Sequence, residues 1–250
     1  MGAHDESSGA GPHEPGAAPG PGELSAKQAT VPGGRPLLML DYDGVVVDSL
    51  DVFTTAFLDS CRVERVAYPA TTDEWLGLFE DNFYAAWRAK GVDDDTIRRV
   101  LDRTTRALIL AGPWLRPFPL MPQVLEALGE ERHVVIVTSS PCEVVERWLP
   151  RHRVAGVAEI AGAESGQSKV GKIQALVARF PGQDAYWYVG DTAGDMREAR
   201  LAGATPLGVA WGWHGREELE AAGAERIADT PADLLAIVAP ELAADFLGTG

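Results

Sequence analysis

Four short apolar runs constrain the fold of this chain more than any other feature. They are Leu37–Leu40, 134–137, 186–189 and 206–210. Because their apolar residues stand at successive positions, each run is expected to be buried on both faces, like a parallel strand beneath helices. Helical patterns lie between the later runs, at 141–149, 169–179 and 193–201. The sequence therefore predicts an α/β fold with a doubly wound, parallel-sheet, Rossmann-like core.

The connection between the first two runs is helical throughout and too long for a single crossover. It spans residues 50 to 117, and Thr72 or Asp73 is expected to cap one of its helices, with Asp93 opening another. An aromatic stripe on this segment is expected to form the segment's own core: Trp75, Phe79, Phe83 and Trp87. These patterns predict an inserted α-helical cap domain at 50–117, with the α/β core at 35–49 and 118–250.

The first 34 residues consist mainly of Gly, Pro, Ala, Ser and Glu and contain almost no large apolar side chain. Such a segment buries too little surface to offset the entropy cost of ordering it. We therefore expect residues 1–34 to be a disordered tail.

The net charge indicates which partners to exclude, and the cysteines indicate the redox compartment. A formal net charge of -15 argues against nucleic acid and against an anionic membrane, since both are bound through basic patches. Cys61 and Cys142 are far apart and outside any metal-binding spacing, which fits a reducing cytoplasm. No apolar stretch reaches transmembrane length, so a cytoplasmic protein without a membrane partner is expected. We expect it to be a monomer or a homodimer.

Polar side chains follow the apolar runs directly. The carboxyl ends of parallel strands meet at one edge of a sheet, where ligands bind. The residues expected to share that edge are Asp41, Asp43 and Gly44 after the first run, Thr138 and Ser139 after the second, Asp191 and Asp195 after the third, and Lys169 at the start of a helix. Two acids one residue apart at a glycine turn suggest a nucleophile, a proton donor and a metal site.

This order of motifs resembles the haloacid dehalogenase superfamily. The matching stretches are Asp41-Tyr42-Asp43-Gly44, then Thr138, then Lys169, then Gly190-Asp191-Thr192-Ala193-Gly194-Asp195. The stretch from Gly208 to His214 and the helical insertion resemble the phosphoglycolate phosphatase-like branch. The resemblance implies a Mg²⁺-dependent phosphatase that hydrolyses a small-molecule phosphate monoester, a small phosphorylated metabolite, through an aspartyl-phosphate.

The resemblance also implies a role for each residue. Asp41 is expected to attack phosphorus, and Asp43 to protonate the leaving alcohol and then to activate water. The phosphate-binding residues are expected to be Gly44, Thr138, Ser139 and Lys169, with Lys172 as the alternative lysine. The expected Mg²⁺ ligands are Asp41, Asp43, Asp191 and Asp195.

The second acid favours phosphoryl transfer over dehalogenation, because a haloalkanoate dehalogenase has no leaving alcohol to protonate and no acid at the position of Asp43. Two alternatives stay open. One is a sugar phosphomutase with the same residues, and the other is a non-catalytic phosphate-binding or switch module. The identity of the phosphate ester is not predicted, because specificity belongs to the cap and the fold does not fix it.

Overall fold

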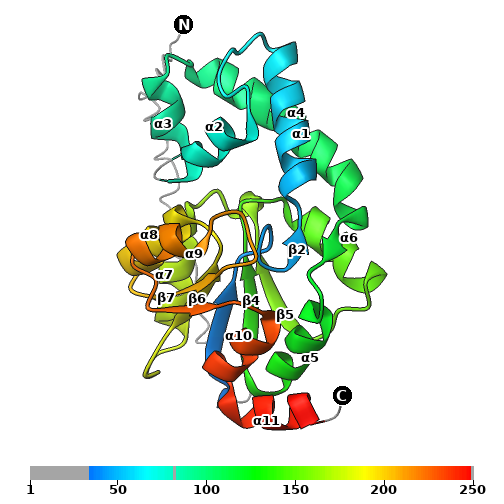
Figure 1. Ribbon diagram of the computed structural model, residues 1–250, viewed down its shortest axis with the longest axis vertical. Coiled ribbons are helices and arrows are strands. Elements are labelled where there is room, and N and C mark those ends of the chain that lie inside the picture. The colour runs from blue at the N-terminus through cyan, green and yellow to red at the C-terminus, as the bar shows by residue number, and fades with distance from the viewer. Residues whose placement is uncertain (1–33, 81–82, 249–250) are drawn as a thin grey trace, which may run out of the picture. The chain divides into compact units, whose positions relative to one another are not determined.

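The computed structural model describes residues 34–80 and 83–248, so the predicted disordered tail lies, apart from Gly34, outside the described residues. Six parallel strands form one sheet in the order β5-β4-β1-β6-β7-β8 (Figure 1). The strands are β1 Leu37–Leu40, β4 His133–Val137, β5 Val157–Ala161, β6 Trp187–Gly190, β7 Thr205–Val209 and β8 Arg226–Ala228. The predicted α/β class and parallel sheet are confirmed.

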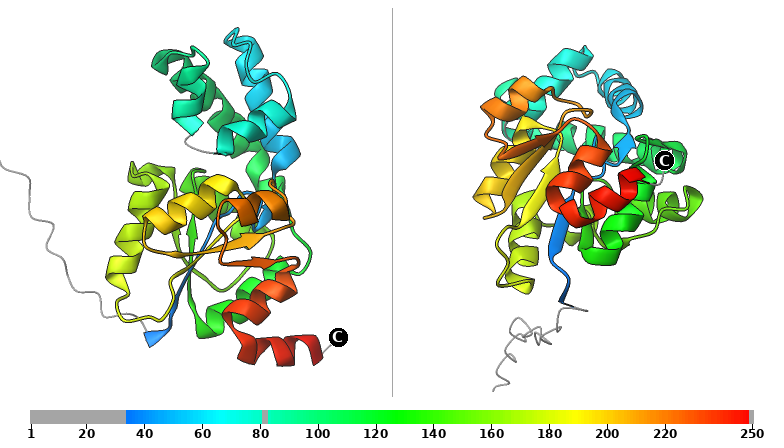
Figure 2. Two further views of the ribbon diagram at one scale, coloured as in Figure 1. Left: turned by 60° about the vertical axis from the view of Figure 1, so that its left-hand side comes forward. Right: turned by 60° about the horizontal axis from the view of Figure 1, so that its bottom comes forward.

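Helices cover both faces of this sheet, as Figure 2 shows. They are α5 Met121–Glu131, α6 Cys142–Arg151, α7 Lys169–Arg179, α8 Ala193–Leu201, α9 Arg216–Ala221, α10 Pro231–Val238 and α11 Pro240–Gly248. The side chains of β1 alternate between the faces: Leu38 and Leu40 belong to the core cluster with α5, α6 and α10, whereas Leu37 and Met39 belong to the cluster with α7 and α8. Burial on both faces explains why the apolar residues are continuous along this strand.

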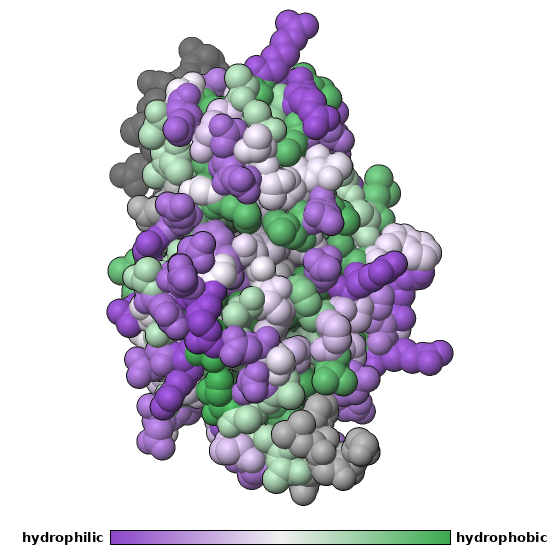
Figure 3. Space-filling model, in the orientation of Figure 1, coloured by the Kyte–Doolittle hydropathy of each residue, from purple (hydrophilic) through white to green (hydrophobic). Residues whose placement is uncertain are grey.

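Hydrophilic residues gather over α9 on the face drawn in Figure 3, where Arg216, Glu217, Glu218 and Glu220 are exposed and Leu219 is buried.

Among the described residues, no helix combines the length and the apolar character needed to cross a membrane.

Most of the residues between β1 and α5 form a separate group of helices (Figure 1). They are α1 Leu50–Val63, α2 Thr72–Leu76, α3 Phe83–Ala89 and α4 Asp94–Ala111, with short 3₁₀ turns at Gly77–Phe79 and Gly112–Trp114. We call this group the helical segment. Its buried cluster includes Phe57, Trp75 and Trp87, as predicted for the two tryptophans. Asp93 caps α4 as predicted, but α2 is capped by Thr71, whose side chain accepts from the Glu74 amide; the prediction of Thr72 or Asp73 is one or two residues late.

A two-stranded antiparallel ribbon lies where the helical segment leaves and rejoins the sheet. β2 Val47–Asp48 pairs with β3 Arg116–Pro117 in the register Val47 to Pro117 and Asp48 to Arg116. The ribbon brings the two ends of the segment together, which is the connectivity that an inserted cap requires. The division into a cap at 50–117 and a core stays a prediction.

Leu120, the residue before α5, has a φ of 67°, in the left-handed region that a β-carbon disfavours. Its side chain is 50% exposed, so little packing is lost with it. We expect Leu120→Gly to leave the free energy of unfolding unchanged or to raise it by up to about 1 kcal/mol. Urea unfolding measures this change. The control Glu126→Gly, at an exposed position inside α5, is expected to cost about 1 kcal/mol, and an equal loss at Leu120 would contradict the argument.

Candidate active site

The strand order brings the predicted acids together. β1 lies between β4 and β6 in the sheet, and the residues that follow these three strands are Asp41, Thr138 and Asp191. The backbone amide of Asp41 donates to the carbonyl of Val189, which fixes the end of β1 against β6 (2.8 Å). Asp41 therefore stands between Thr138 and Asp191 at the carboxyl edge of the sheet.

Three carboxylates converge at this edge. One oxygen each from Asp41, Asp191 and Asp195 lies within 4.8 Å of the others, and all three residues are buried. Asp195 is placed by the first turn of α8, where it forms a capping box with Thr192. The ammonium of Lys169 lies 2.7 Å from Oδ2 of Asp41 and 2.6 Å from Oδ1 of Asp195.

The single positive charge of Lys169 does not neutralise the three carboxylates of this cluster. Burial raises the pKa of Asp41 to about 7, although the charge of Lys169 opposes the rise. Burial, with the neighbouring Asp195 and Asp41, also raises the pKa of Asp191 well above its usual value. The pKa of Asp195 is lowered, because its contacts with Lys169 and Thr192 outweigh burial. Carboxylate oxygens are the donors that Mg²⁺ prefers, and excess negative charge favours a cation, so the donor set fits this ion.

Asp43 has a different environment from Asp41. Its Oδ2 accepts a hydrogen bond of 2.7 Å from the hydroxyl of Ser140. Burial raises the pKa of this carboxyl group, against the hydrogen bond from Ser140 and the charge of Lys169. The protonated form, which can donate a proton, is therefore favoured more than at an exposed aspartate.

Gly44 shapes the turn and does not contribute its amide to the site. Its φ is 74°, and a β-carbon there would lie 1.8 Å from Oδ2 of Asp191, so a side chain would displace that carboxylate. Its N–H donates to the carbonyl of Val47. Gly44 therefore has a structural role in the turn, and its N–H is not directed toward a bound phosphate.

The two candidate lysines occupy different places. Lys169 reaches the carboxylates, whereas the ammonium of Lys172 donates to the carbonyl of Thr138 (2.7 Å). Ser139, beside Thr138, is exposed. Lys169 is therefore the lysine that the structure brings to Asp41.

A small cavity of about 70 Å³ joins these groups. Its walls include Asp41, Asp43, Thr138, Ser139, Ser140, Lys169, Asp191 and Asp195 from the core, and Phe53, Phe79 and Trp213. All the predicted site residues except Gly44 line it. We call it the acid cavity.

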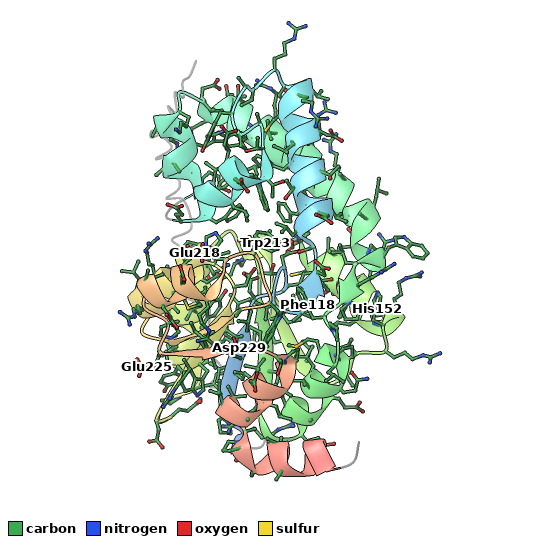
Figure 4. All side chains as sticks on the ribbon, in the orientation of Figure 1. Phe118, His152, Trp213, Glu218, Glu225 and Asp229 are labelled. Atoms are coloured by element: carbon green, nitrogen blue, oxygen red, sulfur yellow. The ribbon has the colours of Figure 1, made fainter. Side chains whose placement is uncertain are left out.

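Sequence reasoning missed the aromatic side of this cavity. The Trp213 amide donates to Oδ2 of Asp191 (2.8 Å), and its ring lies 4.9 Å from the ring of Trp75 and 5.4 Å from that of Phe79. Figure 4 places Trp213 where the helical segment meets the sheet. Phe79, predicted to belong only to the core of the segment, also lines the acid cavity. The sequence signal that could have indicated this aromatic side is the run Trp211-Gly212-Trp213 after β7.

Comparison with known proteins gives consistent matches. The family model described as haloacid dehalogenase-like hydrolase matches residues 38–200. A protein named phosphoglycolate phosphatase from Synechococcus elongatus is 29% identical over 205 residues, which cover 80% of this chain and 96% of that protein. One named probable phosphatase IndB from Dickeya dadantii is 26% identical, with 78% and 90% covered. The solved structure of a haloacid dehalogenase-like family hydrolase from Streptococcus pneumoniae has a TM-score of 0.66 at 21% identity, covering 82% of this chain and 98% of that one.

Proposed function

The chain belongs to the haloacid dehalogenase-like hydrolase family, and on that premise we propose that it is a Mg²⁺-dependent phosphatase that hydrolyses a small-molecule phosphate monoester. The observation that carries the proposal is the position of the Asp41 carboxylate, which lines the acid cavity beside Asp43, Thr138 and Lys169. The relatives named phosphatases support the same reaction.

Asp41 is the proposed nucleophile. Its Oδ1 accepts from the amide of Tyr42 (2.7 Å) and its Oδ2 from Lys169, so the carboxylate is held in one orientation. Attack of one of its oxygens on phosphorus forms an aspartyl-phosphate and releases the alcohol. Hydrolysis of that acyl phosphate regenerates Asp41.

Asp43 is the proposed acid and base. Its raised pKa keeps a proton available for the leaving oxygen, and the carboxylate left behind can then take a proton from the attacking water. Ser140 holds this carboxyl group by its hydrogen bond.

The charge of the transferred group is met by Lys169 and by the polar groups of Thr138 and Ser139. Asp41, Asp191 and Asp195 would hold Mg²⁺, which supplies positive charge to the phosphate oxygens when bound. The helical segment is proposed to act as the cap, because Phe53 and Phe79 from it lie against the acid cavity and exclude water there.

Phosphate release tests the function. With p-nitrophenyl phosphate, we expect turnover in Mg²⁺ and its loss in a chelator, with recovery when Mg²⁺ is restored. Absence of phosphate release in Mg²⁺, or equal release in chelator, would contradict the proposal.

A binding measurement tests the metal site without turnover. Mg²⁺ at about 100 times its dissociation constant stabilises the folded state by about 2.7 kcal/mol, so we expect the melting temperature of the protein to rise by several degrees. Asp191→Asn is expected to abolish this rise, because it removes a carboxylate from the buried cluster. A matched control, Asp102→Asn on the exposed face of α4, should retain it. An equal rise in Asp191→Asn would exclude this residue as a ligand.

A further inference from the structure

A second cavity, of about 280 Å³, adjoins the acid cavity. The two share Phe53, Phe79, Ser139 and Ser140 in their walls. Ser140, which holds the proposed proton donor Asp43, lines this cavity and not the neighbouring one of about 450 Å³. An alcohol that leaves toward Asp43 would therefore extend into the second cavity. We call the second cavity the leaving-group pocket.

Aromatic and aliphatic side chains of the helical segment build most of its wall: Phe53, Phe57, Phe79, Phe83, Tyr84, Leu101 and Leu108. The rings are packed in tilted and edge-on arrangements, with 5.9 Å between the centroids of Phe57 and Phe83 and 5.5 Å between those of Phe79 and Phe83. Such rings favour contact with another flat, apolar group.

None of the described residues that line the leaving-group pocket is charged. The two nearby lysines lie outside this wall: Lys169 pairs with Asp41 and Asp195, and the ammonium of Lys172 donates to the carbonyl of Thr138. A neighbouring cavity of about 450 Å³ that contains these lysines is also lined by Glu198. A carboxylate on the leaving alcohol would thus lose part of its hydration and gain no cation from the pocket wall, which is costly.

We propose that the preferred substrate is a phosphate monoester whose alcohol is uncharged and carries an aromatic or similar flat apolar ring. This inference rests on the proposed phosphatase function and extends it to the leaving group. The ring lies among Phe53, Phe79 and Phe83, and the phosphate lies at Asp41. The chain therefore differs in selectivity from an enzyme that acts on a small carboxylated ester.

Three esters of primary alcohols separate the effect of charge from that of leaving-group reactivity. They are benzyl phosphate, its 4-carboxylated analogue and 2-phosphoglycolate. In Mg²⁺, we expect kcat/KM for benzyl phosphate to exceed that of each carboxylated ester by at least about tenfold, the loss expected when one buried charge is left unpaired. A carboxylated ester used as well as benzyl phosphate, or better, would overturn the inference while leaving the phosphatase function intact. If p-nitrophenyl phosphate and all three esters fail to react, the proposed function falls, and the inference with it.

A charge placed in the pocket tests the same point from the protein side. Thr105 on α4 lines the pocket, and its hydroxyl has no hydrogen-bond partner among the described residues. We expect Thr105→Lys to raise the ratio of kcat/KM for the 4-carboxylated ester over benzyl phosphate at least tenfold. Leu110→Lys adds the same charge to the same helix at a side chain that is 75% exposed and should leave the ratio unchanged. Equal ratios in the two variants would contradict the assignment of the pocket.

A measurement on the unaltered protein covers the case in which Thr105→Lys does not fold. Benzylphosphonate is expected to inhibit p-nitrophenyl phosphate hydrolysis competitively, with an inhibition constant at least tenfold below that of 4-carboxybenzylphosphonate. The opposite order would overturn the inference.

Discussion

Asp41→Asn is expected to reduce kcat for phosphate release to background, a loss of at least about 10³-fold, without unfolding the protein. An amide oxygen cannot displace the alcohol to give an acyl phosphate, so the proposed reaction loses its first step. Asn has the shape of Asp, and burial, by raising the pKa of Asp41 to about 7, already disfavours the charged form in the folded state. The melting temperature is therefore expected to stay within a few degrees of the wild-type value.

The matched control for this variant is Asp229→Asn. The carboxylate of Asp229 pairs with Arg216 at the surface and has no place in the acid cavity (Figure 4). We expect wild-type kcat and KM from it, since exposed ion pairs contribute little to stability. If Asp41→Asn retained a rate near that of Asp229→Asn, Asp41 would not be the nucleophile.

Asp43→Asn is expected to give the second largest effect, and one that depends on the leaving group. For an alkyl phosphate, loss of the proton donor should lower kcat by about 10²- to 10⁴-fold. p-Nitrophenolate leaves without a proton, so with this substrate the first step should survive while hydrolysis of the aspartyl-phosphate is slowed. Rapid mixing should then show a burst of nitrophenolate of about one equivalent per enzyme, followed by slow turnover.

Ser140→Ala provides the comparison for Asp43. Its hydroxyl donates to Asp43 but is not proposed to transfer a proton, so a smaller loss, about tenfold, is expected for alkyl phosphates with no burst. Equal kcat values for Asp43→Asn and the wild type with an alkyl phosphate would remove Asp43 from the chemistry.

The sheet could be predicted because its central strands are buried on both faces. Continuous apolar residues mark β1, β4, β6 and β7, and the predicted helices at 169–179 and 193–201 agree with α7 and α8. The positions of these strands also predicted the position of the site, because polar residues directly after buried parallel strands lie at one edge of the sheet.

The remaining strands lacked that signal. β5 and β8 lie at the two edges of the sheet and are short or interrupted by charge, as by Glu159, whose carboxylate pairs with Arg179. The β2–β3 ribbon has two residues in each strand. No periodicity can be read from so few positions.

The aromatic wall of the site could not be predicted for a different reason. Phe53, Phe79 and Trp213 come from distant parts of the chain, and periodicity identifies a buried face without saying what it faces. The Gly44 turn is a similar case. Its sequence suits a phosphate loop, but only the backbone shows that its N–H is used within the turn.

The covalent state of Asp41 during turnover is the decisive observable. Asp43→Asn mixed with p-nitrophenyl phosphate and Mg²⁺, quenched in acid and mapped by peptide mass spectrometry, should carry one phosphoryl group on Asp41. The modification should be removed by hydroxylamine, as expected of an acyl phosphate, and be absent from a variant that also carries Asp41→Asn. Turnover without any phosphoryl group on Asp41, or a phosphoryl group on another residue, would contradict the aspartyl-phosphate mechanism.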